Sequence, residues 1–199
     1  MERATRACIY VRLLPHEKRK VIKMNDRVIL VDENDRELGM EDKIRAHSGA
    51  GKLHRAFSLF IFNSKGNMLL QKRGENKYHS GGLWTNACCS HPQPGESLDQ
   101  AAHRRLKEEM GFDCALEETF SFLYKANFDN GLTEWEFDHV FIGSFDAEIK
   151  ADKNEVSEWK WVSIEELRSD ISAHPHNYTL WFTIAIDRVL TAYTRMKGR

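Results

Sequence analysis

The 199-residue sequence has only four cysteines and four prolines, no low-complexity tract and no apolar run that approaches the length of a membrane span. A transmembrane helix needs about 20 consecutive apolar residues, so none is expected. The cysteines are Cys8, Cys88, Cys89 and Cys114, with no C-x-x-C pair. Adjacent cysteines do not readily bridge, which excludes a disulfide framework and indicates a reducing, cytoplasmic compartment.

A strong charge of either sign is also missing. Lys and Arg number 29 and Asp and Glu number 30, for a formal net charge of −1. Broad nucleic-acid binding usually shows as a basic face or a high pI, so nucleic acid is not an expected partner. An anionic ligand must therefore be met by Lys and Arg placed locally around it.

The length and the hydrophobic content of 41% suit one domain with a real core. Residues 1–24 differ from the rest, because they carry seven Lys and Arg against two Glu and show no clear period. They lack the apolar core and cleavage site of a secretory signal. We expect residues 1–24 to be an extension outside the fold and residues 25–199 to form a single α/β domain.

Apolar runs and turn signals predict the elements of this domain. Two capping boxes, Ser97 with Gln100 and Ser163 with Glu166, mark helix starts. Residues 74–96 read as mostly loop. The expected strands are two short strands around a polar turn in 24–39, then 55–63 and 67–73 as a hairpin, 120–128 and 133–145 as a second hairpin around "DNG", and 155–163. The expected helices are 40–47, 97–110, a short helix after Ser163, and 178–197. Mixed strands and helices in one domain predict an α/β sandwich.

The helix 97–110 carries two charged residues in its apolar stripe. At 100° per residue, Arg105 and Glu109 fall among the leucines and alanines that should face the core. Charged residues are rarely buried without a partner. They are one turn apart and can simply pair with each other, or they can face a ligand pocket, with Glu109 meeting a divalent cation and Arg105 an anion.

Several residue types suit a metal. His47 and His54 bracket a glycine-containing loop, His91 follows the paired cysteines, and Glu134 and Glu136 share one face of a strand. Such mixed nitrogen and oxygen ligands favour manganese, iron or zinc. Each signal has an ordinary alternative, because single histidines are commonly surface or core residues and an E-x-E pair is commonly a solvated strand face.

Three further features leave alternatives open. Arg73 and Lys77 suit a phosphate group or belong to a solvated loop. Cys89 beside His91 is a candidate reactive thiol, while Cys88 packs as a small apolar residue. The simplest interpretation of Trp181 is a core residue of the last helix, but its ring could also face a cation in a pocket.

The strings "WTNACCSHPQPGES", "AAHRRLKEEMGF", "HRAFSLFIFN" and "TEWEF" closely resemble type 1 isopentenyl-diphosphate isomerase, the Nudix-fold enzyme that interconverts isopentenyl and dimethylallyl diphosphate. The resemblance runs from about residue 26 to the end of the last helix. It implies a Nudix-like α/β/α sandwich with a mixed β-sheet.

The general Nudix box, G-x5-E-x7-R-E-U-x-E-E-x-G-U with U a bulky apolar residue, matches with two departures. Ser90 stands at the first glycine and Arg105 stands where a glutamate belongs. Hydrolases of the superfamily use a carboxylate cluster there to hold metals and activate water. An arginine in that cluster argues against hydrolysis and for holding the diphosphate intact.

The resemblance implies a role for each matching residue. It implies a catalytic Cys89 and Glu136 with Tyr124 as a polar partner of Glu136, and a Mn2+ (or Zn2+ or Fe2+) ion. It also implies a Mg2+ ion at Glu109 that bridges to the diphosphate, and a small-molecule diphosphate substrate. The implied metal ligands are His47, His54, His91, Glu134 and Glu136, and the implied substrate contacts are Lys43, Arg73, Lys77, Arg105 and Trp181.

Three alternatives remain. A Nudix pyrophosphohydrolase would need a glutamate where Arg105 stands. A nucleotide-binding module would tolerate loss of Cys89, and a Cys-His thiol hydrolase would leave the glutamate pair unexplained. We expect a monomer, because no exposed apolar stripe is left unassigned.

Overall fold

The computed structural model describes residues 27–198, so the predicted extension 1–24 and Cys8 lie outside the described residues. Nine strands form one mixed sheet. The strands are β1 (Arg27–Val31), β2 (Glu37–Asp42), β3 (His54–Phe62), β4 (Met68–Arg73), β5 (Trp84–Thr85), β6 (Cys88–Ser90), β7 (Leu116–Asn127), β8 (Thr133–Ser144) and β9 (Val156–Val162). The helices are α1 (Lys43–Ala46), α2 (Leu98–Met110), α3 (Ile164–Ala173) and α4 (Leu180–Lys197), with a 3₁₀ turn over Pro175–Asn177.

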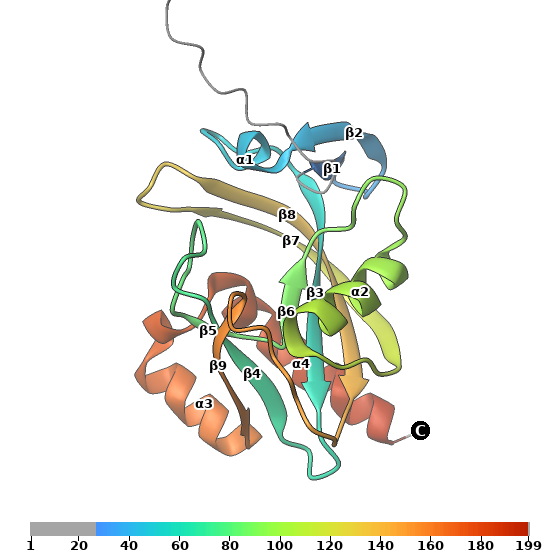
Figure 1. Cartoon of the computed structure of the whole chain (residues 1–199), viewed down its shortest axis with the longest axis vertical. Coiled ribbons are helices and arrows are strands. Elements are labelled where there is room, and N and C mark those ends of the chain that lie inside the picture. The colour runs from blue at the N-terminus through green and yellow to red at the C-terminus, as the bar shows by residue number, and fades with distance from the viewer. Residues whose placement is uncertain (1–26, 199) are drawn as a thin grey trace, which may run out of the picture.

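Strand β3 is the centre of the sheet (Figure 1). Along one edge it pairs with β8 in parallel over its whole length. Its other edge is shared in turn by β1, β6 and β4, all antiparallel. The predicted hairpin of β3 and β4 therefore meets only at Phe62 and Met68, because most of that edge is occupied by β6.

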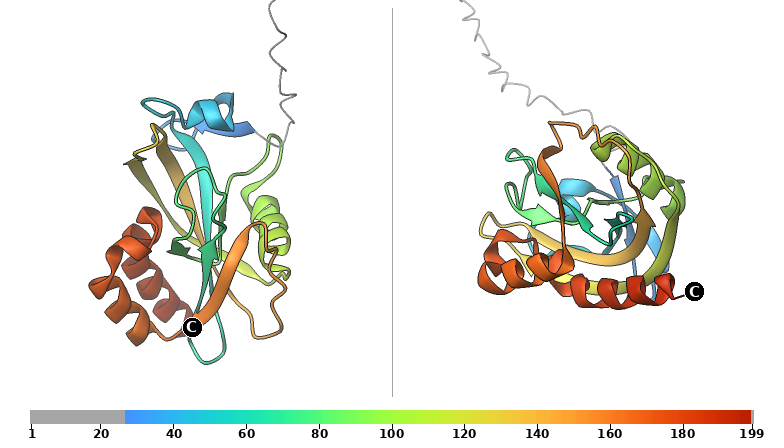
Figure 2. Two further views of the ribbon diagram at one scale, coloured as in Figure 1. Left: turned by 60° about the vertical axis from the view of Figure 1, so that its left-hand side comes forward. Right: turned by 90° about the horizontal axis from the view of Figure 1, so that it is seen from below.

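Helices cover both faces of the sheet, with α2 on one side and α3 and α4 on the other (Figure 2). Alternate residues of β3 supply the two cores. Phe60 and Phe62 pack in the cluster that includes α4, whereas Phe57, Leu59 and Ile61 pack with α2. A strand that is buried on both faces has a nearly continuous apolar sequence, and β3 has such a sequence. The predicted α/β/α sandwich with a mixed sheet is confirmed.

Both predicted capping boxes are present. In α2, Ser97 Oγ accepts from the Gln100 amide at 3.1 Å, and Gln100 Oε1 accepts from the Ser97 amide at 3.0 Å. Gly111 ends this helix in the left-handed conformation at φ 76°, and a Cβ there would collide with the Lys150 carbonyl. Glycine alone tolerates both conditions.

One predicted helix start was wrong. The helix predicted for residues 40–47 begins only at Lys43, because residues 37–42 pair with β1 as strand β2. The segment 74–96 is mostly loop, as predicted, and it also contains the short strands β5 and β6, which pair with β4 and β3. Within residues 27–198, none of the helices combines the length and the apolar character that crossing a bilayer requires.

Candidate functional site

Three neighbouring strands bring polar side chains together at one end of the sheet. The register places Tyr124 of β7 beside Glu136 of β8, and Glu136 beside His54 of β3. Partners in register project from the same face. The Tyr124 hydroxyl donates to Glu136 Oε2 at 2.6 Å, and Glu136 Oε1 lies 3.4 Å from His54 Nε2. Tertiary pairing thus joins three residues that are distant in sequence.

The backbone fixes the orientation of two histidines. His47 Nδ1 lies 2.7 Å from the Lys43 carbonyl, and His54 Nδ1 lies 2.7 Å from the Lys52 carbonyl. A carbonyl can only accept, so each Nδ1 carries the hydrogen and each Nε2 keeps its lone pair. This arrangement is typical of histidines that bind metals.

The free ring nitrogens converge. His54 Nε2 lies 3.1 Å from His91 Nε2, which lies 2.8 Å from Glu136 Oε1. One ligand atom from each of His47, His54, His91 and Glu136 lies within 4.8 Å of the others. His47 Nε2 is buried and has no hydrogen-bond partner among the described residues. Four lone-pair atoms at such distances fit a divalent cation, so the donor set suits the predicted metal.

Glu134 lies in a second, overlapping group. Its ligand atom lies within 4.8 Å of those of His47 and His79, and all three residues are buried. Its place in a five-ligand site therefore stays a prediction. Sequence reasoning missed His79, because it lies in the loop between β4 and β5, whose path depends on the folded structure.

The carboxylates of β8 have opposite electrostatic settings. Burial, with Glu136 close by, raises the pKa of Glu134 to about 8. Burial also acts to raise the pKa of Glu136, but His54 and His91 outweigh it and hold that pKa well below its ordinary value. Burial lowers the pKa of His47 to about 4 and that of His91 well below its ordinary value. Neutral histidines keep the lone pair that a metal needs.

Cys89 lies on β6, in register with Ser58 of β3. Its Sγ donates to Asn86 Oδ1 at 3.0 Å and accepts from the Trp181 indole nitrogen at 3.0 Å. Burial raises the pKa of Cys89 to about 12, so the thiol keeps its proton at neutral pH. Cys88, its neighbour, is fully buried in the core beside α2, as predicted.

The pocket that contains these groups is small and polar, with a volume of about 50 Å³. A wider groove of about 310 Å³ shares part of its wall. All the predicted site residues line the small pocket except His47 and His54, which are fully buried. The lining residues are Lys43, Arg73, Lys77, Tyr78, His79, Cys89, Ser90, His91, Arg105, Glu109, Tyr124, Glu134, Glu136 and Trp181.

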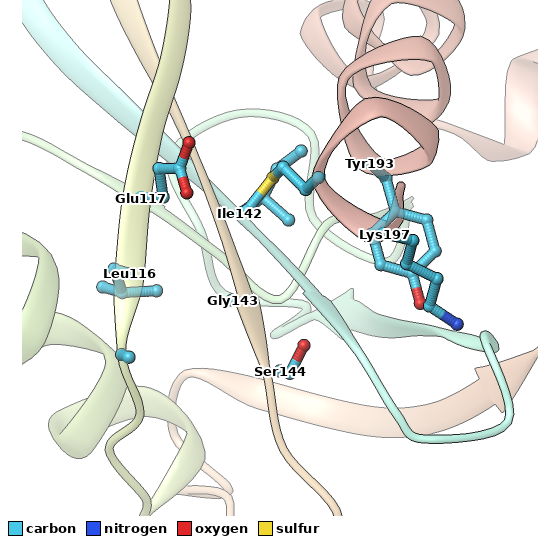
Figure 3. Close-up of a pocket in the computed structure, with 9 residues that line it drawn as sticks. Leu116, Glu117, Ile142, Gly143, Ser144, Tyr193 and Lys197 are labelled. Atoms are coloured by element: carbon cyan, nitrogen blue, oxygen red, sulfur yellow. The ribbon is translucent and has the colours of Figure 1, made fainter. Parts of the chain in front are cut away.

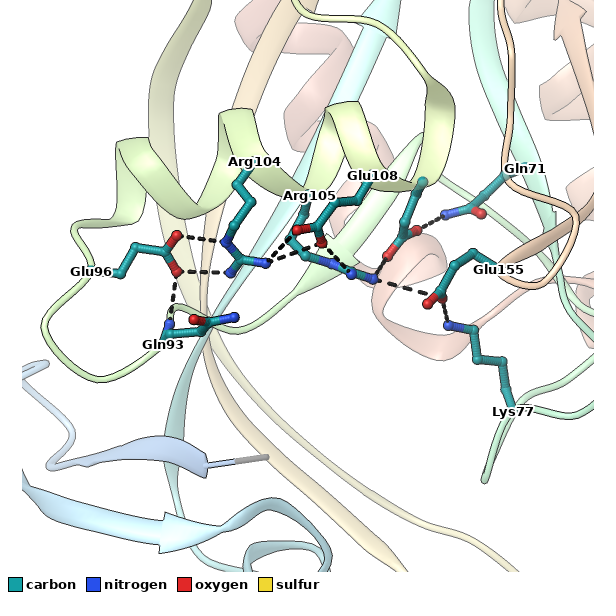
Figure 4. A network of polar contacts seen from close by, with 9 residues as sticks. Gln71, Lys77, Gln93, Glu96, Arg104, Arg105, Glu108 and Glu155 are labelled. Atoms are coloured by element: carbon teal, nitrogen blue, oxygen red, sulfur yellow. Dashed lines mark hydrogen bonds and ion pairs between the residues drawn. The ribbon is translucent and has the colours of Figure 1, made fainter. Parts of the chain in front are cut away.

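A chain of ion pairs surrounds the predicted diphosphate contacts (Figure 4). Arg105 contacts Glu109, Glu108 at 2.7 Å and Glu155 at 3.6 Å. Lys77 pairs with the same oxygen of Glu155. The alternative that Arg105 and Glu109 pair with each other is therefore correct, and both residues also line the pocket.

Glu109 is held from a second side as well. Gln71 of β4 donates from Nε2 to Glu109 Oε2 at 3.1 Å. Two residues that match the Nudix box, Arg104 and Glu96, form a bidentate ion pair at 2.6 and 2.8 Å. This pair ties the loop before α2 to the helix. Glu155 and Gln71 were not predicted as parts of this network, because neither belongs to a recognisable motif.

The Arg73 guanidinium lies 5.1 Å from the centre of the Trp181 ring, a cation–π distance. Its Nε is buried without a partner among the described residues. Lys43 Nζ lies 5.0 Å from the Tyr78 ring. The site therefore combines cations, an aromatic wall, a protonated thiol and a candidate metal group, which suits proton transfer on an anionic, partly apolar substrate.

Comparison with known proteins identifies the family of this chain. The NUDIX domain family matches residues 52–182. The isopentenyl-diphosphate Delta-isomerase 1 of Aromatoleum aromaticum is 53% identical, over 84% of this chain and 94% of that protein. The isopentenyl-diphosphate Delta-isomerase 2 of Photorhabdus laumondii is 54% identical, over 80% and 89%.

A crystal structure of a Deinococcus radiodurans protein matches the fold with a TM-score of 0.61 at 22% identity, covering 74% of this chain and 89% of that one. This likeness supports the architecture alone. The family match, residues 52–182, includes α2 and all the predicted site residues except Lys43 and His47. The chain belongs to the Nudix superfamily and, within it, to the isopentenyl-diphosphate Delta-isomerase family.

Proposed function

We propose that this protein interconverts isopentenyl diphosphate and dimethylallyl diphosphate. The observation that carries the proposal is one pocket in which the Cys89 thiol and the Glu136 carboxylate both line the wall, beside Trp181 and four cations. The isomerase activity named for the relatives requires one group that gives a proton and one that accepts a proton. The substrate must gain one proton at its terminal alkene carbon and lose another from a neighbouring carbon.

Cys89 and Glu136 rest in opposite protonation states. Burial holds the proton on the thiol by raising the pKa of Cys89, and the pKa of Glu136 is held low by its histidine neighbours despite burial. One group can therefore give a proton while the other accepts one, and the roles reverse in the reverse reaction. Tyr124 fixes the Glu136 carboxylate through its 2.6 Å hydrogen bond.

Trp181 supports the charged state between the two transfers. Protonation of the alkene places positive charge on a tertiary carbon, and the face of an aromatic ring attracts such a charge. The Trp181 indole nitrogen also donates to Cys89 Sγ, which positions the thiol beside the ring. The core residues around Trp181 exclude water that would quench a cation.

His47, His54, His91 and Glu136, with Glu134, would hold the transition metal, which we propose to be Mn2+, Zn2+ or Fe2+. When bound, it would supply a fixed positive charge that holds Glu136 ionised and in place. Glu109 would hold a Mg2+ ion that accompanies the diphosphate. Arg73, Lys77, Arg105 and Lys43 would bind the diphosphate oxygens directly.

We also propose that the enzyme is a cytoplasmic monomer that takes only a small-molecule substrate. The near-neutral net charge and the free thiols of Cys88, Cys89 and Cys114 support this placement.

Proton NMR of isopentenyl diphosphate with the protein, Mg2+ and Mn2+ in D2O tests the reaction. We expect the terminal methylene signals to disappear, deuterium to enter the product methyl group and the diphosphate to stay intact. Release of phosphate would favour the hydrolase alternative. An unchanged spectrum with folded, metal-loaded protein would reject the isomerase.

A further inference from the structure

His79 is a buried histidine that no part of the proposed reaction uses. It lies in the loop between β4 and β5, with 5% of its surface exposed. Its Nε2 lies 3.2 Å from Glu134 Oε1, but this contact does not have hydrogen-bond geometry. The His79 ring nitrogen therefore lies close to Glu134 without forming a hydrogen bond to it.

His79 and two neighbouring residues each have a buried polar atom without a hydrogen-bond partner among the described residues: His47 Nε2, His79 Nε2 and Glu134 Oε2. Leaving a buried polar atom unpaired destabilises a protein, so three such atoms on neighbouring residues indicate a ligand. The ligand atoms of these residues lie within 4.8 Å of one another.

A cation can be shared by all three groups, whereas each water hydrogen serves one acceptor at a time. His47 Nε2 accepts only, since its Nδ1 hydrogen is used by the Lys43 carbonyl. Two imidazole nitrogens and a carboxylate oxygen instead form a donor set typical of a divalent transition metal.

The surroundings lock the His79 ring. Its Nδ1 lies 3.2 Å from Ser80 Oγ, a hydroxyl that can accept the Nδ1 hydrogen and leave the Nε2 lone pair free. The ring stacks on Phe128 at 4.6 Å between centres and meets the edge of Tyr78 at 4.3 Å. Ser80 adopts a left-handed backbone at φ 52°, which is strained for a serine. A strained, packed loop that aims one nitrogen at the site indicates pre-organisation.

We propose that His79 is a further ligand of the transition-metal site, and that it binds the ion together with His47 and Glu134. The two groups share His47, whose Nε2 has one lone pair, so a single ion must serve both. The site then offers four imidazoles and two carboxylates. This nitrogen-rich set favours zinc or iron over magnesium.

The inference rests on the metal site of the proposed function, but metal binding can be measured without substrate. Metal-free full-length protein is titrated with Co2+ against a competing chelator, and the visible absorption of bound Co2+ is recorded. His79→Phe keeps a ring against Phe128 and removes the nitrogen. Because even outer-shell changes weaken metals 10–100-fold, we expect at least about 100-fold weaker binding and a changed spectrum.

His139→Gln is the matched control. His139 is also buried on β8 but lies between Asp35 at 3.1 Å and Glu118 at 2.7 Å, away from the metal group. The control should keep the wild-type affinity and spectrum. Thermal unfolding of the metal-free forms checks that both variants fold.

A second variant, His79→Cys, covers the case in which His79→Phe fails to fold. If residue 79 reaches the ion, a thiolate-to-cobalt charge-transfer band appears that the wild type lacks. Wild-type affinity and spectrum in His79→Phe, or no new band in His79→Cys, would each overturn the proposal. If isopentenyl diphosphate is isomerised while His79 proves indifferent to Co2+, only this inference fails. If His79 proves a ligand but no isomerisation occurs, only the proposed reaction fails.

Discussion

The two ends of β8 border two very different cavities. The larger, about 610 Å³, lies where β7 and β8 approach the end of α4 and is lined by Leu116, Glu117, Ile142, Gly143, Ser144 and Tyr193 among others (Figure 3). The candidate site, near Glu134 and Glu136, encloses only about 50 Å³. Cavity volume alone therefore does not show which end of β8 carries the candidate site.

The difference lies in the polar atoms. The small pocket contains buried ring nitrogens, carboxylates and a guanidinium, several of them without partners among the described residues. The larger cavity offers more apolar than polar surface and none of the candidate metal ligands found in residues 27–198. A site in this protein is therefore recognised by buried groups that need a ligand, and the predictions below test whether only that end carries function.

Cys89→Ala should have the largest effect. Removing a proton-transfer group typically costs 10²–10⁴-fold in rate, so we expect about a thousandfold loss of isomerisation in the NMR assay. Cys88→Ala, which changes the adjacent core thiol, should retain activity. Equal losses in both variants would indicate damaged packing instead of chemistry.

Removal of the transition metal should follow. In the metal-free protein the ring nitrogens of His47, His54 and His91 lie close together with no ion between them, and a metal that binds only the folded state stabilises that state more as its free concentration exceeds Kd. We expect chelation to lower both the activity and the thermal unfolding midpoint, with both restored by Mn2+ or Zn2+. An unchanged midpoint in protein verified as metal-free would contradict the site.

Arg105→Gln should weaken substrate binding more than turnover. A hydrogen bond to a charged group contributes about 1.5–3 kcal/mol, so KM should rise roughly 10–100-fold with a smaller change in kcat. The variant also leaves Glu109 without its ion pair, so the Mg2+ requirement should change. A lower kcat at unchanged KM would place Arg105 in the chemical step.

Alkaline pH should weaken substrate binding through Lys43. Burial, with the Lys77 charge nearby, lowers the pKa of Lys43 to about 8. Its cation, available to the diphosphate at pH 7, is lost as pH rises above 8, so KM should rise between pH 7.5 and 9. The folded protein binds fewer protons than the unfolded chain between about pH 8 and the ordinary lysine pKa of 10.5, so Lys43 contributes rising stability with pH there. Lys43→Arg should abolish the change in KM.

Tyr193→Phe, in the wall of the larger cavity, should have the smallest effect. The Tyr193 hydroxyl is buried without a partner among the described residues, and its ring stacks on Phe62 at 3.6 Å. Removing the hydroxyl keeps the stacking, so activity should be unchanged and stability should shift by less than about 1 kcal/mol. A marked loss of activity would break the contrast between the two ends.

Much of this molecule follows from local sequence signals. The capping boxes at Ser97 and Ser163 predict helix starts, and "DNG" predicts the β7–β8 hairpin, because backbone hydrogen bonds within a few residues determine these features. The position of Glu134 and Glu136 on one strand face follows from the two-residue period of a strand.

Only the tertiary structure decided which distant groups meet. The parallel register of β3 with β8 joins His54 to Glu136, and the path of the β4–β5 loop brings His79 to Glu134. Whether Arg105 pairs with Glu109 or faces the pocket was open in the sequence, and the fold allows both. Sequence periodicity determines the face on which a side chain lies, whereas strand register and loop packing, which involve residues far apart in the chain, determine what that side chain contacts.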